Sequence, residues 1–131
     1  MPETLPLVAS LGQIALTVTD LARATSFYRD ILGLPFLFEA SHMAFFDCAG
    51  VRLMLTIPET PQPPGNSILY YRTDDIQAAC ARLQAGGVTL DAPARRIARM
   101  PDHDLWMAFF RDSEGNLLAL MSEVRGGAEA S

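Results

Sequence analysis

An internal repeat is the feature of this sequence that most constrains its fold. The segments QIALTVTDL (13–21) and ILYYRTDDI (68–76) share a strand-like run, an acidic residue and a following aliphatic residue, at an offset of 55 residues. Each runs into a stretch with apolar residues at helical spacing, at 21–33 and 76–87. Because self-similarity at a fixed offset marks a repeated supersecondary unit, we predict two similar modules.

The ends of both predicted helices carry signals for starting and stopping. Asp20 precedes the first helix, and either Asp74 or Asp75 precedes the second, where a carboxylate accepts hydrogen bonds from first-turn amides. Gly33 and Gly86–Gly87 are suitable C-terminal stops.

Three strand-like segments follow each predicted helix. They are 35–40, 43–47 and 51–57 in the first module and 88–94, 105–111 and 116–122 in the second. Gly50 and Gly115 lie in the hairpin turns, where positive φ costs glycine little. We therefore predict an α+β fold of two tandem βαβββ modules within a single domain, 1–131.

The boundaries of the modules follow from composition. The modules span about 11–57 and 67–124, and the proline-rich segment 58–66 favours an extended linker. The Gly- and Ala-containing tail 125–131 is predicted to be frayed.

Composition excludes several function classes. The basic residues are ten arginines and no lysine, which rules out Schiff-base lysine chemistry and a lysine-bearing phosphate loop. The net charge of -5 and the pI near 4.8 argue against binding to nucleic acid or to an anionic membrane. We expect a cytoplasmic protein, because the sequence shows neither a signal peptide nor a long apolar span, and Cys48 and Cys80 are expected to be reduced thiols.

The segments TVTDLARATSFYRDILGL (17–34) and FRDSEGNLLAL (110–120) resemble the vicinal oxygen chelate superfamily. This group includes glyoxalase I, extradiol dioxygenases and bleomycin-resistance proteins. The second segment is similar to the family's Asp-Pro-x-Gly-Asn turn, with Ser113 where proline is usual. The resemblance covers about 11–124. It implies that the curved sheets of the two modules form a cup with the helices outside.

The resemblance also locates the superfamily's metal site. Family enzymes hold one divalent ion through the first and last strands of each module, and these positions correspond to Gln13, Met54, Ile68 and Ala119. Ile68 and Ala119 offer no donor and Met54 offers only a soft thioether, whereas such ions prefer imidazole and carboxylate ligands. We therefore expect no metal and no other cofactor.

Strand alternation identifies the side chains that share the cup face with those four positions. Arg52 and Arg72 fall on it, either as anchors for an anionic ligand or as solvent-facing or ion-paired residues. Tyr70 and the methionines are either pocket wall or packing residues. The predicted ligand-binding set is Gln13, Thr17, Arg52, Met54, Tyr70, Arg72, His103 and Trp106.

One segment between two predicted strands is the weak candidate for catalysis. His103 lies between two aspartates in RMPDHDLWMAFF, either as an exposed loop residue or as an acid, a base or a ligand donor at a pocket rim with Trp106. Glu123 is its candidate partner. Whether the protein is an enzyme stays open at this point.

The leading hypothesis is a metal-independent, glyoxalase/bleomycin-resistance-like protein that binds a small organic ligand, with an anionic ligand as the form that the arginines favour. The alternative is a lyase, isomerase or dioxygenase of the same superfamily, with a non-standard metal site or with His103 and Glu123 as an unassisted acid–base pair. A third reading is a structural or regulatory partner module. A homodimer is expected from family analogy.

Overall fold

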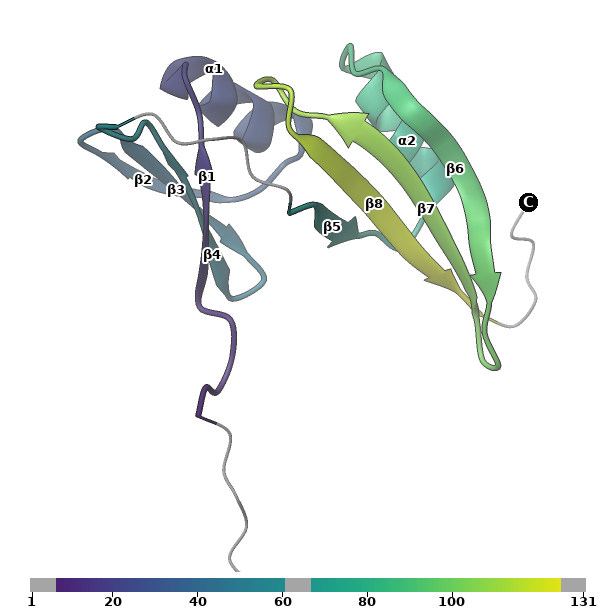
Figure 1. The fold of residues 1–131 in the computed structure, drawn as a ribbon. Helices are drawn as coiled ribbons and strands as arrows, with labels where there is room; N and C mark the ends of the chain where they lie inside the picture. The colour runs from purple at the N-terminus through teal and green to yellow at the C-terminus, as the bar shows by residue number, and fades with distance from the viewer. Residues whose placement is uncertain (1–6, 61–66, 126–131) are drawn as a thin grey trace, which may run out of the picture. The chain divides into compact units, whose positions relative to one another are not determined.

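The computed structural model describes residues 7–60 and 67–125. The chain divides into two compact units, 1–62 and 63–131. The predicted linker 58–66 contains the boundary between the units; its residues 61–66 and the tail residues 126–131 lie outside the described part. Each unit holds one four-stranded mixed sheet with its helix on one face (Figure 1). The α+β prediction with two βαβββ modules is confirmed. The single domain and the closing of the two sheets into a cup stay predictions.

Sheet A belongs to the first unit and has the order β1-β4-β3-β2. The strands are β1 (Gln13–Thr17), β2 (Phe36–Ala40), β3 (Met43–Cys48) and β4 (Val51–Thr56). β1 pairs with β4 in parallel, and the other neighbours are antiparallel. β2 is an edge strand and is exposed along its whole length.

The helical segment of the first unit packs against β3 and β4. It begins as α1 (Leu21–Ser26), where the Asp20 side chain accepts a hydrogen bond from the amide of Arg23 at 3.0 Å, as predicted. It continues as the π-helical turn η1 (Phe27–Ile31), a difference from the regular helix expected over 21–33. The wider turn accompanies the burial of two consecutive aromatic residues, Phe27 and Tyr28, on the sheet side.

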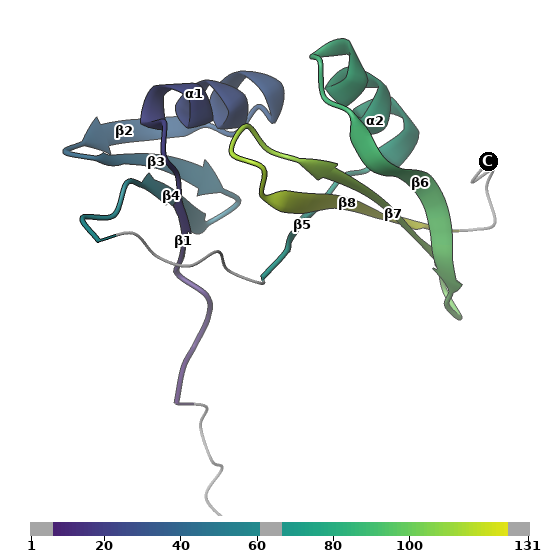
Figure 2. The same ribbon diagram turned by 45° about the horizontal axis from the view of Figure 1, so that its top comes forward.

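Sheet B belongs to the second unit and has the order β5-β8-β7-β6 (Figure 2). The strands are β5 (Leu69–Arg72), β6 (Leu90–Arg99), β7 (Asp104–Arg111) and β8 (Leu117–Val124). The helix α2 (Ile76–Ala85) packs against β6, β7 and β8. Asp75, and not Asp74, accepts the capping hydrogen bond, from the amide of Ala78 at 3.1 Å.

The strand expected at 88–94 differs most from its prediction, because β6 extends to Arg99. It remains paired with β7 through three irregularities in register. As an edge strand, β6 also tolerates Pro93, which lacks an amide proton for a central ladder. The β6–β7 connection is therefore a short turn, closed by a hydrogen bond from the amide of Met100 to the carbonyl of His103 at 2.7 Å.

The core of each unit lies between its helix and its sheet. Tyr28, Phe46, Leu53 and Leu55 fill the first, and Phe110 and Leu118 are fully buried in the second. Burial of a side chain of this size contributes about 1.5–3 kcal/mol. The opposite side of each sheet, away from its own helix, is called here the open face.

Two smaller predictions also concern the fold. Cys48 and Cys80 are both free thiols, as expected. None of the helices in the described part of the chain is long and apolar enough to cross a membrane.

Candidate functional site

The open face of sheet A carries four of the predicted ligand-binding residues. The register aligns Gln13 with Arg52 and Ala15 with Met54 across β1 and β4, and Thr17 follows two positions further along β1. Leu53 and Leu55, which alternate with these residues, are buried on the helix side. The structure therefore brings together Gln13, Thr17, Arg52 and Met54.

Arg52 and Gln13 form the central polar contact of this face. The Nε of Arg52 donates a hydrogen bond to Oε1 of Gln13 at 2.9 Å. The Nε2 of Gln13 lies 4.0 Å from the Sδ of Met54, its acceptor. The side-chain amide of Gln13 is thus held between a guanidinium and a thioether.

These contacts test whether the superfamily's metal positions suit a divalent ion in this chain. Of the four side chains, only Gln13 has an oxygen, and that oxygen already accepts from a guanidinium. Ile68 and Ala119 supply no donor atom. Within residues 7–60 and 67–125, no three His, Cys, Asp or Glu side chains form a group that could hold a metal ion. The donor set does not fit a divalent cation.

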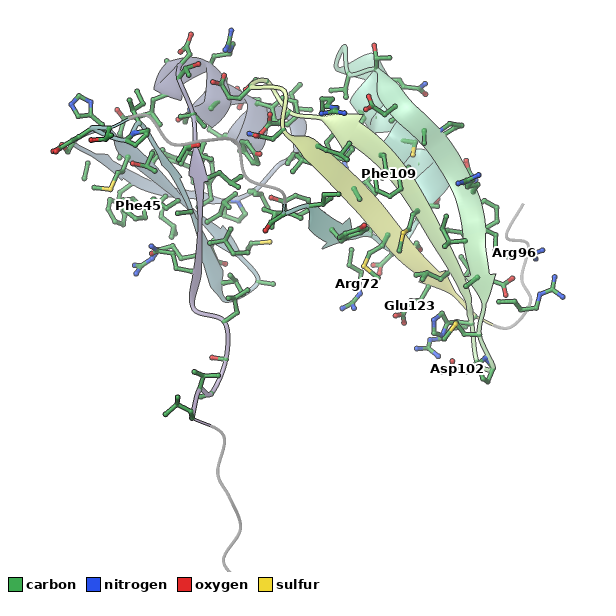
Figure 3. All side chains as sticks on the ribbon, viewed as in Figure 1. Phe45, Arg72, Arg96, Asp102, Phe109 and Glu123 are labelled. Carbon is green, nitrogen blue, oxygen red and sulfur yellow. The ribbon has the colours of Figure 1, made fainter. Side chains whose placement is uncertain are left out.

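The open face of sheet B carries Tyr70 and Arg72. Their register partners on β8 are Ala119 and Met121. The rings of Tyr70 and Phe109 form a T-shaped pair with centroids 6.0 Å apart. Arg72 is exposed, and its side chain has neither a hydrogen bond nor an ion pair within the described residues. Glu123 is not its ion-pair partner, although both labelled side chains lie toward the same end of sheet B in Figure 3.

Trp106 lies apart from these residues. Its register partners are Ser122 on β8 and Arg96 on β6. Ser122 is buried, and alternation separates Trp106 from Met107 and Met121 on the open face. Trp106 therefore lies on the helix side of sheet B, and its indole nitrogen is buried without a hydrogen-bond partner among the described residues. Its role as a ligand contact stays a prediction that this placement does not favour.

His103 and Glu123 come together at the end of sheet B. The Nε2 of His103 lies 4.0 Å from Oε2 of Glu123, and its Nδ1 lies 2.7 Å from Oδ1 of Asp102. The His103 side chain is only 14% exposed. Arg125 closes the group, with its Nη1 donating to Asp102 at 2.9 Å and its Nη2 to Glu123 at 3.3 Å.

The charges of this group reinforce one another. The Arg125 guanidinium, and after it the imidazole of His103, lower the pKa of the Asp102 carboxyl below its usual value. Asp102 in turn raises the pKa of Arg125. The imidazole of His103 thus lies between two carboxylates, at hydrogen-bonding distance from Asp102 and at 4.0 Å from Glu123.

Sequence reasoning missed two aromatic residues on the open face of sheet A. Phe38 on β2 and Phe45 on β3 are register partners, and their rings stack with centroids 4.4 Å apart and an interplanar angle of 21°. The Arg52 guanidinium carbon lies 5.7 Å from the centre of the Phe45 ring, whose position on sheet A Figure 3 labels. Alternation within 43–47 is the signal that could have placed Phe45 on this face, whereas the register irregularity in β2 hides the position of Phe38.

Comparison with known proteins identifies the family. The chain belongs to the Glyoxalase/Bleomycin resistance protein/Dioxygenase superfamily, whose family model matches residues 10–120. The resemblance drawn from the two sequence segments is confirmed.

Individual relatives cover different shares of the chain. The metallothiol transferases FosB of Staphylococcus haemolyticus and Staphylococcus epidermidis are each 33% identical over 67 residues, which is 51% of this chain. The match spans about half the length of these relatives, 47%.

Solved structures match over most of the chain. TnmS3, an antibiotic-binding protein from Streptomyces sp. CB03234, has a TM-score of 0.72 and 28% identity, covering 91% of this chain and 99% of its own. Lactoylglutathione lyase from Agrobacterium tumefaciens has a TM-score of 0.72 and 22% identity, covering 89% and 96%. The latter likeness shows the fold alone.

Proposed function

We propose that this protein is a binding member of its superfamily that holds a small organic anion without a metal ion. The observation that carries the proposal is the hydrogen bond from Arg52 Nε to Gln13 Oε1 at 2.9 Å. Gln13 has the one side-chain oxygen among the four positions at which superfamily enzymes bind their metal. The hydrogen bond places the permanent positive charge of Arg52 directly beside that oxygen.

Electrostatics determines whether a cation or an anion binds beside Gln13 and Arg52. A divalent cation at Gln13 would lie beside a guanidinium and lose free energy to repulsion, which grows as water is excluded. An anionic group gains from the same charge, because a guanidinium donates to a carboxylate or phosphate through two parallel hydrogen bonds. Arg72, unpaired within the described residues, adds a second positive charge on the open face of sheet B.

The similarity to TnmS3 supports the binding class. That protein binds an antibiotic, and its likeness covers 91% of this chain. We propose a ligand of the same general kind, a small organic molecule such as an antibiotic. The FosB relatives are named metallothiol transferases, so metal content is the first property of this protein to measure.

The test uses protein purified without chelator. We expect elemental analysis to find no stoichiometric metal, and calorimetric titration with Zn²⁺, Mn²⁺, Ni²⁺ and Fe²⁺ to show no binding that depends on Gln13. A panel of acidic aromatics, antibiotics and glutathione conjugates should contain compounds that raise the melting temperature by mass action. A stoichiometric metal that is lost in Gln13→Ala would overturn the proposal.

The second candidate function is enzymatic and rests on the contact between His103 and Glu123 at 4.0 Å. An acid–base pair of this kind would serve a lyase or isomerase reaction without a metal. Turnover of a superfamily substrate that survives chelation and collapses in His103→Ala would favour this candidate. Turnover that is retained in His103→Ala would exclude it.

We also propose a cytoplasmic homodimer. Support comes from the family, whose members either close the cup within one chain or share strands between two chains. Sedimentation equilibrium over a range of concentrations should give twice the mass of one chain, 14.3 kDa. A monomer at every concentration would contradict the dimer.

A further inference from the structure

We propose that the open face of sheet A selects a planar aromatic ring that carries an anionic group. The inference rests on the proposed function and names the ligand class for that site. It is carried by the juxtaposition of an aromatic pair with an arginine that is already fixed in place.

The apolar part of this surface is one row across three strands. The register aligns Phe38 of β2 with Phe45 of β3, and Phe45 with Met54 of β4. Phe38 is 45% exposed, whereas Phe45 is almost covered by its neighbours. The row therefore presents one open aromatic ring and one polarizable thioether, both of which favour contact with another aromatic ring.

The charged part lies beside this row. Arg52 is anchored twice, through its Nε to Gln13 and by its position 5.7 Å from the centre of the Phe45 ring. Both contacts leave the two Nη nitrogens available, and Arg52 forms no ion pair within the described residues. An arginine held in this way binds an anion with less loss of side-chain entropy.

The nearest carboxylate does not neutralise Arg52. Asp47 is its register partner on β3, but Oδ1 of Asp47 accepts from the amide of Gly50 at 3.2 Å. No ion pair within 4.0 Å joins the two side chains in the described part of the protein. The guanidinium edge is therefore open to an anion from outside the chain.

The combination distinguishes ligand classes. A ligand ring lies against the row of Phe38, Phe45 and Met54, and its carboxylate, sulfonate or phenolate reaches the Nη edge of Arg52. A neutral aromatic compound leaves the guanidinium without a partner, and a saturated acid forgoes the aromatic contact. Sheet B lacks the same arrangement, because no described side chain holds its Arg72 in position.

The experiment measures binding of three matched probes to the full chain. 2-Naphthoate carries both features, 2-naphthamide lacks the charge, and cyclohexanecarboxylate lacks the aromatic ring. We expect saturable binding of 2-naphthoate by calorimetry or by its own fluorescence. Each of the other probes should bind at least about tenfold more weakly, given the strength of a charged bidentate hydrogen bond and of aromatic contacts.

Matched variants locate the site. Arg52→Gln should weaken 2-naphthoate binding at least about tenfold, and Phe38→Leu by about threefold to tenfold. Arg29→Gln removes the same charge from η1, and Leu37→Ala removes an exposed apolar side chain from the next position of β2. Both controls should leave binding unchanged. Arg52→Lys keeps the charge without the planar fork and should bind 2-naphthoate more weakly than the wild type. This variant provides the test if Arg52→Gln fails to fold.

The outcomes separate this inference from the proposed function. Equal binding of 2-naphthoate and cyclohexanecarboxylate, or an affinity that does not change in both Arg52→Gln and Arg52→Lys, overturns the inference. So does a panel in which other compounds bind and 2-naphthoate does not, although the proposed function then survives. A stoichiometric metal at Gln13, with no compound bound, overturns both.

Discussion

Arg52 and Gln13 face each other across the parallel pair of β1 and β4, and a hydrogen bond of 2.9 Å joins them. The side-chain amide of Gln13 thereby orients the guanidinium of Arg52, whereas superfamily enzymes use the same position to bind a metal ion. Because the amide is neutral, it orients the guanidinium without reducing its charge. This relationship leads to the first two predictions.

Gln13→Glu should weaken the binding of 2-naphthoate about as much as Arg52→Gln. The new carboxylate would form an ion pair with Arg52 and compete with the ligand for the same charge. The matched change Gln13→Ala removes the anchor alone and should have a smaller effect. Calorimetric titration of the variants measures the difference, and unchanged affinity in Gln13→Glu would contradict the role given to Arg52.

Asp47→Asn should strengthen 2-naphthoate binding by about twofold to fivefold, because it removes a negative charge beside Arg52. The gain should shrink at high salt, since exposed charges are screened. Asp30→Asn, placed in η1, serves as the charge-matched control and should leave the affinity as it is. Weaker binding in Asp47→Asn would show that this carboxylate supports the site.

The pKa of Asp102 should lie below its ordinary value of 3.8 and rise in Arg125→Gln, because Arg125 is the main cause of its depression. His103→Ala should raise it less. A group with a lowered pKa stabilises the fold above its unfolded pKa, and this contribution is lost as pH falls through the folded value. The wild type should therefore lose more stability than Arg125→Gln on acidification below about pH 4. Carbon-detected NMR titration of the carboxyl measures the pKa, with Asp30 as an internal reference that stays unchanged.

Asp112→Ala should destabilise the second unit by about 2 kcal/mol or more. Asp112 is a buried residue, 6% exposed. It accepts from the amides of Glu114 and Asn116 at 2.9 and 2.8 Å, and from the Asn116 side chain at 2.9 Å. Removing the carboxylate leaves these donors in the β7–β8 turn without an acceptor.

Asp91→Ala is the matched control for the turn. It breaks only the exposed pair between Asp91 and Arg111, and should cost about 0.5 kcal/mol. Urea denaturation compares the two variants. Equal losses would show that the turn does not depend on its buried carboxylate.

The repeat made much of the fold predictable, because its signals are local. An aspartate before each helix caps it, and Gly33, Gly50 and Gly115 all have positive φ where a stop or a turn was expected. Alternation likewise placed Gln13, Arg52 and Met54 on one face, as the register of β1 and β4 shows.

The features of the structure that the sequence did not predict lie where a helix or strand departs from its regular periodicity. The π-helical turn η1 has no spacing pattern of its own in a stretch this short. The three irregularities in β6 interrupt the period of two that marks a strand. The same kind of irregularity in β2 shifts Phe38 into register with Phe45. A single residue of offset moves a side chain to the other face, so the aromatic pair could not be inferred from alternation alone.

The irregular course of β6 also bears on how the protein behaves when it is concentrated. An edge strand offers unpaired amides and carbonyls to any passing strand, and long regular edges recruit copies of themselves into aggregates. The pairing of β6 with β7 is irregular at three places, which bends the strand. β6 also contains Pro93 and exposes Arg95, Arg96 and Arg99 along its second half. This irregular, arginine-rich edge is therefore a poor template for the addition of a further strand.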